Sequence, residues 1–460
     1  MVRTNSNSTD QKLSEKIRKT PDFNSMIRIT FWNGLGFIFF MFLKSYVVIY
    51  FFGGSGVTLG IIIALQPLAR LFSMPLIAYL TDHTSKKRLV LIGSIGRTLA
   101  YSLYWTSLVI QNLFLFGVGT FCQGLLVGFF WPPFYSLISE KSYKGNRTQA
   151  LAEGRGKMIG YGFLLGAFIS IPIFSIVSIF LPENIPLMYS PLLIFAIINV
   201  FAGIRFYLRV DENLTFEKFR ATLNDSSFKI NDSQEKIETI DIEGNENKKK
   251  DKIFYFGFFS LILVIMAISV NGMIYSPFIS AFLIENLLDF SERIIPIIVM
   301  VVYFPAQVIS QLMASKFGKL FDRISPLISV AIIGCFKALM ILLLIYAFSA
   351  IDFAIFLVFL YIASESNIYL IQSIMSRISI KHRGKIFGLY MWIDQLGRVI
   401  GPIIGGILWD TYEYYVPFLL SIYIGLCLIP FLMFAIRNLR PYMVEKVEID
   451  TIGIVKIKNR

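Results

Sequence analysis

Long apolar segments alternate with short polar turns along almost the whole chain of 460 residues. A helix needs roughly 20 residues to cross the hydrocarbon core of a bilayer, and twelve of the apolar segments reach that length. The pattern therefore predicts an all-α integral membrane protein with twelve transmembrane helices. The expected helices cover residues 27–52, 57–81, 88–110, 112–139, 149–181, 186–208, 253–284, 293–317, 326–349, 353–376, 385–409 and 413–436.

One interior segment, residues 209–252, is long and polar, and it divides the expected helices six and six. We therefore expect two pseudo-symmetric six-helix bundles, residues 27–208 and 253–436, joined by a cytoplasmic linker. Residues 1–26 and 437–460 are expected to be cytoplasmic tails. Twofold internal repetition is common in transporters, which bind their substrate where the two halves meet.

The charged residues gather in alternate turns, which predicts the orientation of the chain. Lysine and arginine are concentrated after the expected second, fourth, eighth and tenth helices, and short loops rich in these residues stay in the cytoplasm. Both termini should therefore be cytoplasmic, with the protein in the plasma membrane. The net charge of +13 suits contact with anionic lipid headgroups. Because the basic residues are scattered over short turns, nucleic acid is not an expected partner, and we expect a monomer.

A short charged turn occurs at the same place in both halves. It reads AYLTDHTSKKR after the second helix and GKLFDRISPL after the eighth. Each copy places an aspartate at the membrane edge, where a carboxylate can accept hydrogen bonds from the free amides at the N-terminus of another helix. We expect these turns to form a gate; the alternative is a solvated turn whose charges only set the orientation. The gate candidates are Asp82, Lys86, Lys87, Asp322 and Arg323.

With its twelve helices, its two halves and this duplicated turn, the chain resembles the major facilitator superfamily over all but its tails and linker. The family pattern has glycine before and after the aspartate, whereas the first copy here has Ala78 and Ser85 at those positions. The resemblance implies transport by alternating access. It also implies that Asp82 meets the start of the eleventh helix and Asp322 the start of the fifth, which holds the cytoplasmic side shut.

The expected eleventh helix, GLYMWIDQLGRVIGPIIGGIL, has a glycine at every fourth position. Such a row allows close helix packing, and opposite charges four residues apart can pair along one helix face. The helix resembles the Gly-Pro-Gly-Gly pattern that the drug antiporters of the family carry in their fifth helix, so its place in the eleventh makes drug antiport less favoured. The helix-packing candidates are Asp394, Gly397, Arg398, Gly401, Pro402 and Gly405.

Charged residues inside the apolar helices are further candidates, because a charge near the bilayer centre costs about 2.5–3.5 kcal/mol. Glu365 is the carboxylate predicted closest to the midplane, and we expect it to carry a coupling proton. Arg70, at similar depth in the other half, is its candidate partner and a cavity residue. Arg97 and Lys44 lie nearer the membrane faces, where their long side chains are expected to snorkel outward.

Three buried amides, Asn33, Asn271 and Gln307, are also candidates for the substrate cavity, with interhelical hydrogen bonds as the alternative. No catalytic residue, metal site or cofactor is expected, because the only histidines, His83 and His382, lie in turns and the sequence contains no recognised catalytic motif.

These features predict a secondary transporter, not an enzyme, that couples a small polar solute to protons. The stretch ALQPLARLFSMPLIAYLTD in the second helix is similar to the family branch of oligosaccharide and nucleoside proton symporters, which favours sugars, nucleosides or related metabolites. Two alternatives stay open: an efflux antiporter, and a nutrient sensor with the same fold that does not transport.

Overall fold

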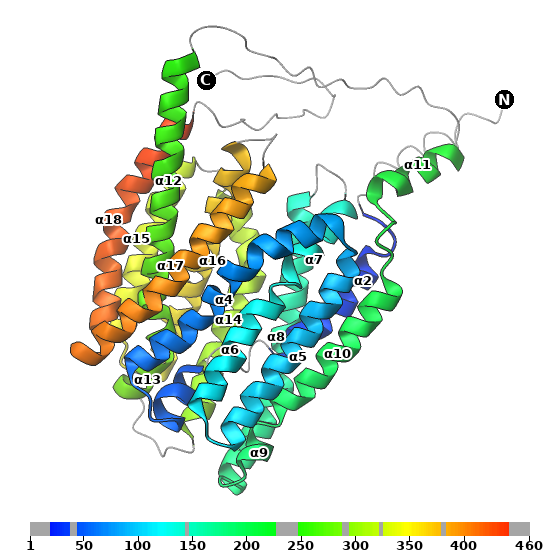
Figure 1. Ribbon diagram of the computed structural model, residues 1–460. Coiled ribbons are helices and arrows are strands. Elements are labelled where there is room, and N and C mark those ends of the chain that lie inside the picture. Colours follow the sequence, from blue (N-terminus) through cyan, green and yellow to red (C-terminus); the bar gives the residue numbers. More distant parts are fainter. Residues whose placement is uncertain are drawn as a thin grey trace, which may run out of the picture.

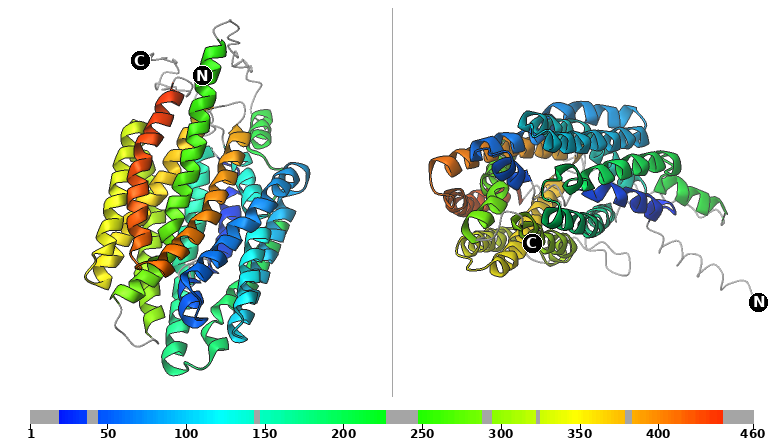
Figure 2. Two further views of the ribbon diagram at one scale, coloured as in Figure 1. Left: turned by 60° about the vertical axis from the view of Figure 1, so that its left-hand side comes forward. Right: turned by 90° about the horizontal axis from the view of Figure 1, so that it is seen from below.

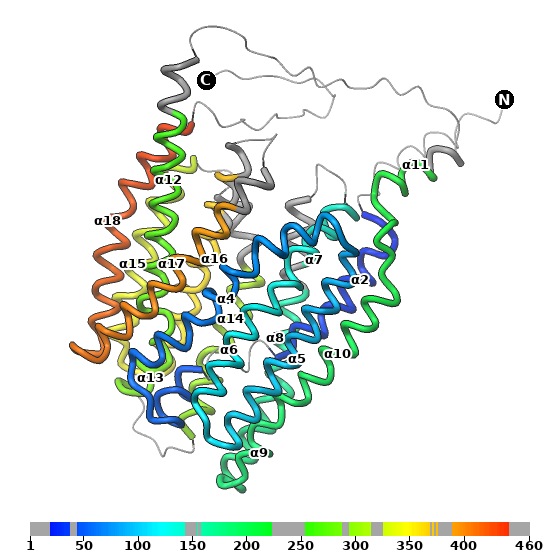
Figure 3. The backbone as a smooth tube through the Cα atoms, viewed as in Figure 1, coloured from blue at the N-terminus to red at the C-terminus, as the bar shows by residue number. Residues whose placement is uncertain are grey.

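The computed structural model of the chain describes residues 19–36, 44–142, 147–226, 247–287, 294–321, 325–378 and 383–440. Long helices dominate these residues (Figure 1), and Figure 3 follows the chain through them. The described residues contain no β-strand, only an isolated bridge between Lys19 and Ser142. The all-α class predicted from the sequence is confirmed.

The helices of the first half follow the expected spans. The side chains of Ser55, Asn112 and Asn184 accept hydrogen bonds from backbone N–H groups three residues on, and such caps satisfy donors at helix starts. The expected fourth helix is divided between α6 and α7, ahead of Pro132, because proline lacks an N–H.

In chain order the elements of the first half are α2 (Phe23–Phe31), η1 (Trp32–Gly34), η2 (Val47–Phe51), α4 (Gly56–His83), α5 (Lys86–Val109), α6 (Leu113–Val127), α7 (Trp131–Glu140), α8 (Arg147–Phe180), α9 (Ile185–Met188), α10 (Pro191–Arg209) and α11 (Phe216–Ser226).

The second half repeats this arrangement. Its first helix is interrupted at Pro277, where a short 3-10 segment separates α12 from α13. Its elements are α12 (Asn247–Tyr275), η4 (Ser276–Phe278), α13 (Ile279–Leu287), α14 (Ile295–Phe321), α15 (Pro326–Ile345), α16 (Ala350–Ile378), α17 (Arg383–Thr411) and α18 (Val416–Leu439).

Nine helical stretches of the described residues are long and apolar enough to cross a membrane. The helices α5 and α17 are not among them, and both carry interior charges, Arg97 on α5 and the pair Asp394 and Arg398 on α17. Of the first expected helix, residues 27–36 and 44–52 are described. Together these elements match the twelve helices predicted from the sequence.

The two bundles meet mainly along two helix pairs, α4 with α17 and α8 with α14. Figures 1 and 2 show the bundles side by side, with α4 next to α17 at their junction. Each half therefore contributes its second and its fifth helix, as a pseudo-twofold repeat requires. We call the end at which α4 begins and α17 ends the outer end, and the opposite end, next to α11, the inner end.

Glycines allow the helices at this junction to approach closely. A Cβ atom on Gly60 would collide with the carbonyl oxygen of Pro402, and one on Gly406 would collide with that of Gly56. The two backbones are therefore in direct contact near the outer end. The predicted glycine row of α17 faces its other neighbour, since Gly397, Gly401 and Gly405 lie against the backbone of α12.

Candidate functional site

Charged side chains meet at the junction of α4 and α17, partway along it. Arg70 lies 10 residues beyond Gly60 on α4, and Asp394 lies 8 residues before Pro402 on α17, which runs in the opposite direction. At 1.5 Å per residue these offsets, about 15 and 12 Å, place both side chains at a similar depth. Arg70 accordingly interacts electrostatically with Asp394 and with Arg398.

Asp394 is the most heavily hydrogen-bonded carboxylate of this group. Its Oδ2 atom accepts from Nε of Arg398 at 2.7 Å and from Nε2 of Gln395 at 3.3 Å, and its Oδ1 atom accepts from Oγ of Ser269 at 2.6 Å. The ion pair joins residues four apart on α17, and the serine ties it to α12. The carboxylate of Asp394 is therefore already engaged within its own bundle.

Glu365 lies on α16, which packs against α17. Its carboxylate interacts electrostatically with Arg398, and its Oε2 atom is buried with no hydrogen-bond partner in the described part of the chain. The cation beside Glu365 is thus Arg398, on the neighbouring helix, whereas the sequence suggested Arg70. The role of Glu365 in proton coupling stays a prediction.

A polar network from the first bundle extends toward the same junction. Nζ of Lys44 donates to Oε1 of Gln66 at 3.2 Å and lies 5.9 Å from the ring centroid of Tyr104. The hydroxyl of Tyr104 donates to Oε1 of Gln123 at 2.6 Å. Gln66 precedes Arg70 by one helical turn, so Lys44 lies close to Arg70, with which it interacts electrostatically. The expectation that Lys44 snorkels outward is wrong, because its ammonium group bonds to another transmembrane helix.

Arg97 does not snorkel either; its side chain is fully buried. Nη1 donates to the backbone oxygen of Asn33 at 2.6 Å, and the guanidinium lies 4.9 Å from the ring centroid of Phe130. A polar carbonyl and an aromatic face stabilise a cation where water is absent. Asn33 is also fully buried, next to Arg97, and its place in a substrate cavity stays a prediction.

The other two predicted amides have partners within the second bundle. Gln307 is buried on α14, where its side chain is hydrogen-bonded to the hydroxyl of Tyr361. Asn271 is buried on α12, and its backbone oxygen accepts from Oγ of Ser421 at 3.4 Å. Asn33, Asn271 and Gln307 therefore have different partners, Arg97, Ser421 and Tyr361, and their place in one substrate cavity stays a prediction.

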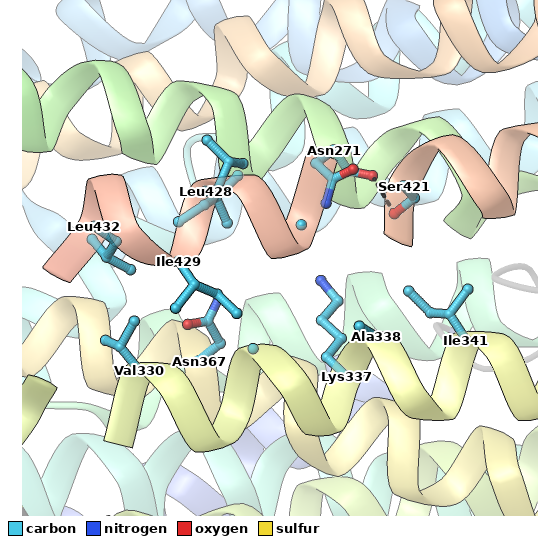
Figure 4. Close-up of a pocket in the computed structure, with 13 residues that line it drawn as sticks. Asn271, Val330, Lys337, Ala338, Ile341, Asn367, Ser421, Leu428, Ile429 and Leu432 are labelled. Carbon is cyan, nitrogen blue, oxygen red and sulfur yellow. Dashed lines mark hydrogen bonds between the residues drawn. The ribbon is translucent and has the colours of Figure 1, made fainter. Parts of the chain in front are cut away.

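Asn271 lines a separate cavity inside the second bundle. Figure 4 shows Lys337 of α15 extending toward Asn271 and Ser421 across this cavity, whose wall also includes Asn367. Nζ of Lys337 lies 5.7 Å from the ring centroid of Tyr275. Our reading of the sequence overlooked Lys337, although a single lysine in the middle of an otherwise apolar helix is a detectable signal.

The predicted gate turn after α4 has local partners. Asp82 is exposed, while Nζ of Lys86 forms an ion pair with Glu140 at 2.7 Å. The carboxylate of Glu212 accepts from Oγ of Ser85 at 3.1 Å and from the backbone N–H of Lys87 at 3.3 Å, which caps the start of α5. Asp322 and Arg323 lie outside the described residues, as do the side chains at the start of α17, so the predicted gate contacts stay predictions.

A buried lysine holds the inner end of the first bundle together. The side chain of Lys141 is 1% exposed. Its Nζ atom donates to Oδ2 of Asp22 and to the backbone oxygen of Asp211, both at 2.6 Å, and to that of Leu214 at 3.1 Å. One ammonium group thus joins the segment before α2, the end of α7 and the segment after α10, a role that the sequence did not reveal.

At the outer end, Asp410 near the end of α17 caps the start of α4. Its Oδ1 atom accepts from the backbone N–H of Gly56 at 2.7 Å, and its Oδ2 atom accepts from that of Val57 at 2.8 Å. Free amides and the positive end of the helix dipole both favour a carboxylate there. This contact has the chemistry that we predicted for Asp82, but it lies at the opposite end of the same helix pair.

The arrangement at the junction can bind a polar solute or a proton, since it combines guanidinium, ammonium, carboxylate and hydroxyl groups between two bundles. Among the described residues, no group of three or more His, Cys, Asp and Glu side chains is placed to hold a metal ion.

Comparison with known proteins agrees with this fold. The family model described as Major Facilitator Superfamily matches residues 26–377 and 261–457. No curated protein matches the sequence.

Several solved transporters share the fold. A bacterial homologue of the human lysosomal transporter Spinster, in an inward-facing and unoccupied conformation, is similar with a TM-score of 0.65 and 13% identity, covering 92% of this chain and 98% of that one. The nucleoside transporter NupG is similar with a TM-score of 0.60 and 14% identity, covering 92% and 100%. A POT family transporter in complex with 5-aminolevulinic acid gives 0.63 and 11%, covering 91% and 96%.

Proposed function

The chain belongs to the major facilitator superfamily, and on that premise we propose that it is a proton-coupled secondary transporter of a small polar solute, working by alternating access. Membership of this family places the protein among transporters rather than enzymes. It also makes the chain a multi-pass membrane protein whose partner is a small molecule.

The observation that carries the proposal is the position of the charged side chains at the α4/α17 junction, Arg70, Asp394 and Arg398, relative to the hydrogen bonds between the bundles. Within the described residues, every hydrogen bond that crosses from one bundle to the other lies at the outer end; the first-bundle residues that make them are Ser45, Tyr50, Gly56 and Val57. Arg70 and Asp394 lie further toward the inner end. Polar side chains that lie between two bundles joined at their outer end support a solute site that is closed toward the outer end.

Coupling to protons is supported by Glu365. A carboxylate inside the membrane is costly and is typically found in proton relays, and the buried Oε2 atom of Glu365 is available to hold a proton. The solute class is supported by the polar composition of the junction and by the likeness of the fold to NupG, which its title calls a nucleoside transporter. We therefore favour sugars, nucleosides or related metabolites as solutes.

The proposal is tested with the purified chain in proteoliposomes. We expect at least one labelled solute from a panel of sugars, nucleosides, amino acids and organic acids to accumulate when an inward proton gradient is imposed, but not without it. Protein-free liposomes and a protonophore are the controls. Accumulation of a solute that is driven by an outward-directed proton gradient would favour an efflux antiporter. Binding of a solute without its movement across the membrane would favour a sensor.

We further propose that the inner end faces the cytoplasm, in the plasma membrane and with a single chain as the working unit. Residues 27–208 and 253–436 would then form the two bundles, and the linker 209–252 would be cytoplasmic. Lys86, Lys87 and Lys141 all lie at the inner end, as the positive-inside rule requires. We expect an added protease to cleave the linker in inside-out vesicles but not in intact cells; cleavage in intact cells would contradict this orientation.

A further inference from the structure

The first bundle contains interior cations without interior acids. Lys44, Arg70 and Arg97 lie within its helices, well away from both ends. Its acidic residues are all near helix ends or in turns of the sequence. These acids are Asp82, Glu140, Glu153 and Glu183.

Two of the three cations have evident partners. Arg97 donates to the backbone oxygen of Asn33 and lies against Phe130. Lys44 donates to Gln66 and lies over Tyr104. These contacts satisfy donors, but none of them supplies a negative charge.

Arg70 is different, because in the described part of the chain its guanidinium has neither an ion pair nor a hydrogen bond. The nearest carboxylate in the facing helix, Asp394, is held by Arg398, Ser269 and Gln395. Arg398 also interacts repulsively with Arg70. The half-buried guanidinium of Arg70 therefore shares its nearest carboxylate with Arg398, which already forms an ion pair with it.

Basic side chains outnumber acidic ones among the described residues of the junction. Lys44, Arg70, Arg97 and Arg398 are basic, whereas Asp394 and Glu365 are acidic. An uncompensated charge inside a membrane protein is costly and usually marks the path of a substrate or an ion. A bound anion would offset the excess.

We propose that the transported solute is a small organic anion whose carboxylate or phosphate group binds Arg70, with Lys44 beside it. This inference rests on the proposed transport function and narrows the related metabolites favoured above to anionic ones, in place of neutral sugars and nucleosides. A guanidinium suits the task because its planar N–H groups match two oxygens of a carboxylate or phosphate at once. Since the hydrogen bonds made by Asp410 join the bundles at the outer end, we expect the anion to enter from the inner end.

The test measures anion binding by the purified full chain in detergent, without requiring transport. Malonate and inorganic phosphate are the probes, chloride at equal ionic strength is the reference, and thermal unfolding is the readout. We expect at least one probe to raise Tm more than chloride does. In Arg70→Gln the apparent affinity for that probe should fall about tenfold or more, since a hydrogen bond to a charged group contributes about 1.5–3 kcal/mol. A response to malonate alone indicates a carboxylate, and a response to phosphate alone indicates a phosphate.

Arg88→Gln is the matched control, because it removes the same charge from an exposed position at the start of α5. Non-specific stabilisation by these salts would raise Tm equally in the parental protein, in Arg70→Gln and in Arg88→Gln. Arg70→Lys keeps the charge but loses the planar fork, so we expect an intermediate affinity, and it replaces Arg70→Gln if that variant does not accumulate.

Two results would overturn the proposal: no probe-specific rise in Tm in the parental protein, or the same rise in Arg70→Gln. Neither result bears on whether the chain transports. Conversely, proteoliposomes that accumulate only neutral solutes would reject the anion and retain the transporter.

Discussion

Replacing Glu365 with glutamine is expected to abolish proton-driven accumulation of the solute while leaving exchange of solute across the membrane intact. The amide keeps the shape of the side chain but cannot take up and release a proton. Each proton that moves inward across 100 mV supplies about 2.3 kcal/mol, so a variant that moves no proton cannot concentrate the solute. In Glu365→Gln the expected ratio of the solute concentration inside the vesicles to that outside is therefore about one.

The experiment compares uptake under an imposed pH gradient with exchange in its absence, both in proteoliposomes. Asp352→Asn is the matched control, since Asp352 is the other carboxylate of α16 and lies at its outer end, bonded to Ser349. This control should accumulate solute normally. If Glu365→Gln still follows the pH gradient, another group carries the proton, and Asp394 would be the next candidate.

The Asp410→Ala variant is expected to open the outer end of the protein. The change removes two hydrogen bonds from a carboxylate to the backbone amides of Gly56 and Val57, and each hydrogen bond to a charged group contributes about 1.5–3 kcal/mol. A net loss of about 2 kcal/mol would shift the equilibrium toward an outward-open state about 30-fold. The amides of α4 would then be satisfied by water.

This shift is measurable as a distance between spin labels on the two bundles. Labels on Ile110→Cys, between α5 and α6, and Phe348→Cys, between α15 and α16, occupy exposed positions at the outer end, after Cys122, Cys335 and Cys427 have been replaced by serine. The distance distribution should gain a longer component in Asp410→Ala.

The control for Asp410 is Glu413→Ala, which removes an exposed carboxylate three residues further along the chain. Its distance distribution should match that of the parental protein. An unchanged distribution in Asp410→Ala would show that glycine packing between Gly60 and Pro402 holds the outer end closed without the cap.

The duplicated charged turn shows how far local sequence can locate a contact. The sequence suggested that Asp82 and Asp322 cap helices of the other half, and those two contacts stay predictions. The structure assigns the observed contact to Asp410, 354 residues from its partner Gly56. A carboxylate near a helix end is visible in the sequence, whereas the helix start that it meets depends on how the bundles pack.

The buried cations illustrate the same limit. Depth along a helix can be counted from the sequence, and it placed Arg70 and Glu365 at similar levels. Depth alone could not show that Arg398 lies beside Glu365, or that Arg97 and Lys44 turn inward to polar partners. The rotation of each helix about its axis sets these contacts, and side-chain packing with the neighbouring helices sets that rotation.

The sequence by itself determined the all-α membrane class, the twelve helices and the family, because a bilayer demands long apolar stretches wherever the chain crosses it and that demand acts locally. Only the tertiary structure decided which charges meet at the junction, which partners Asn33, Asn271 and Gln307 have, and that Asp410 joins the bundles at the outer end. These outcomes depend on contacts between residues hundreds of positions apart, whose geometry is set by the close approach of glycine-lined backbones.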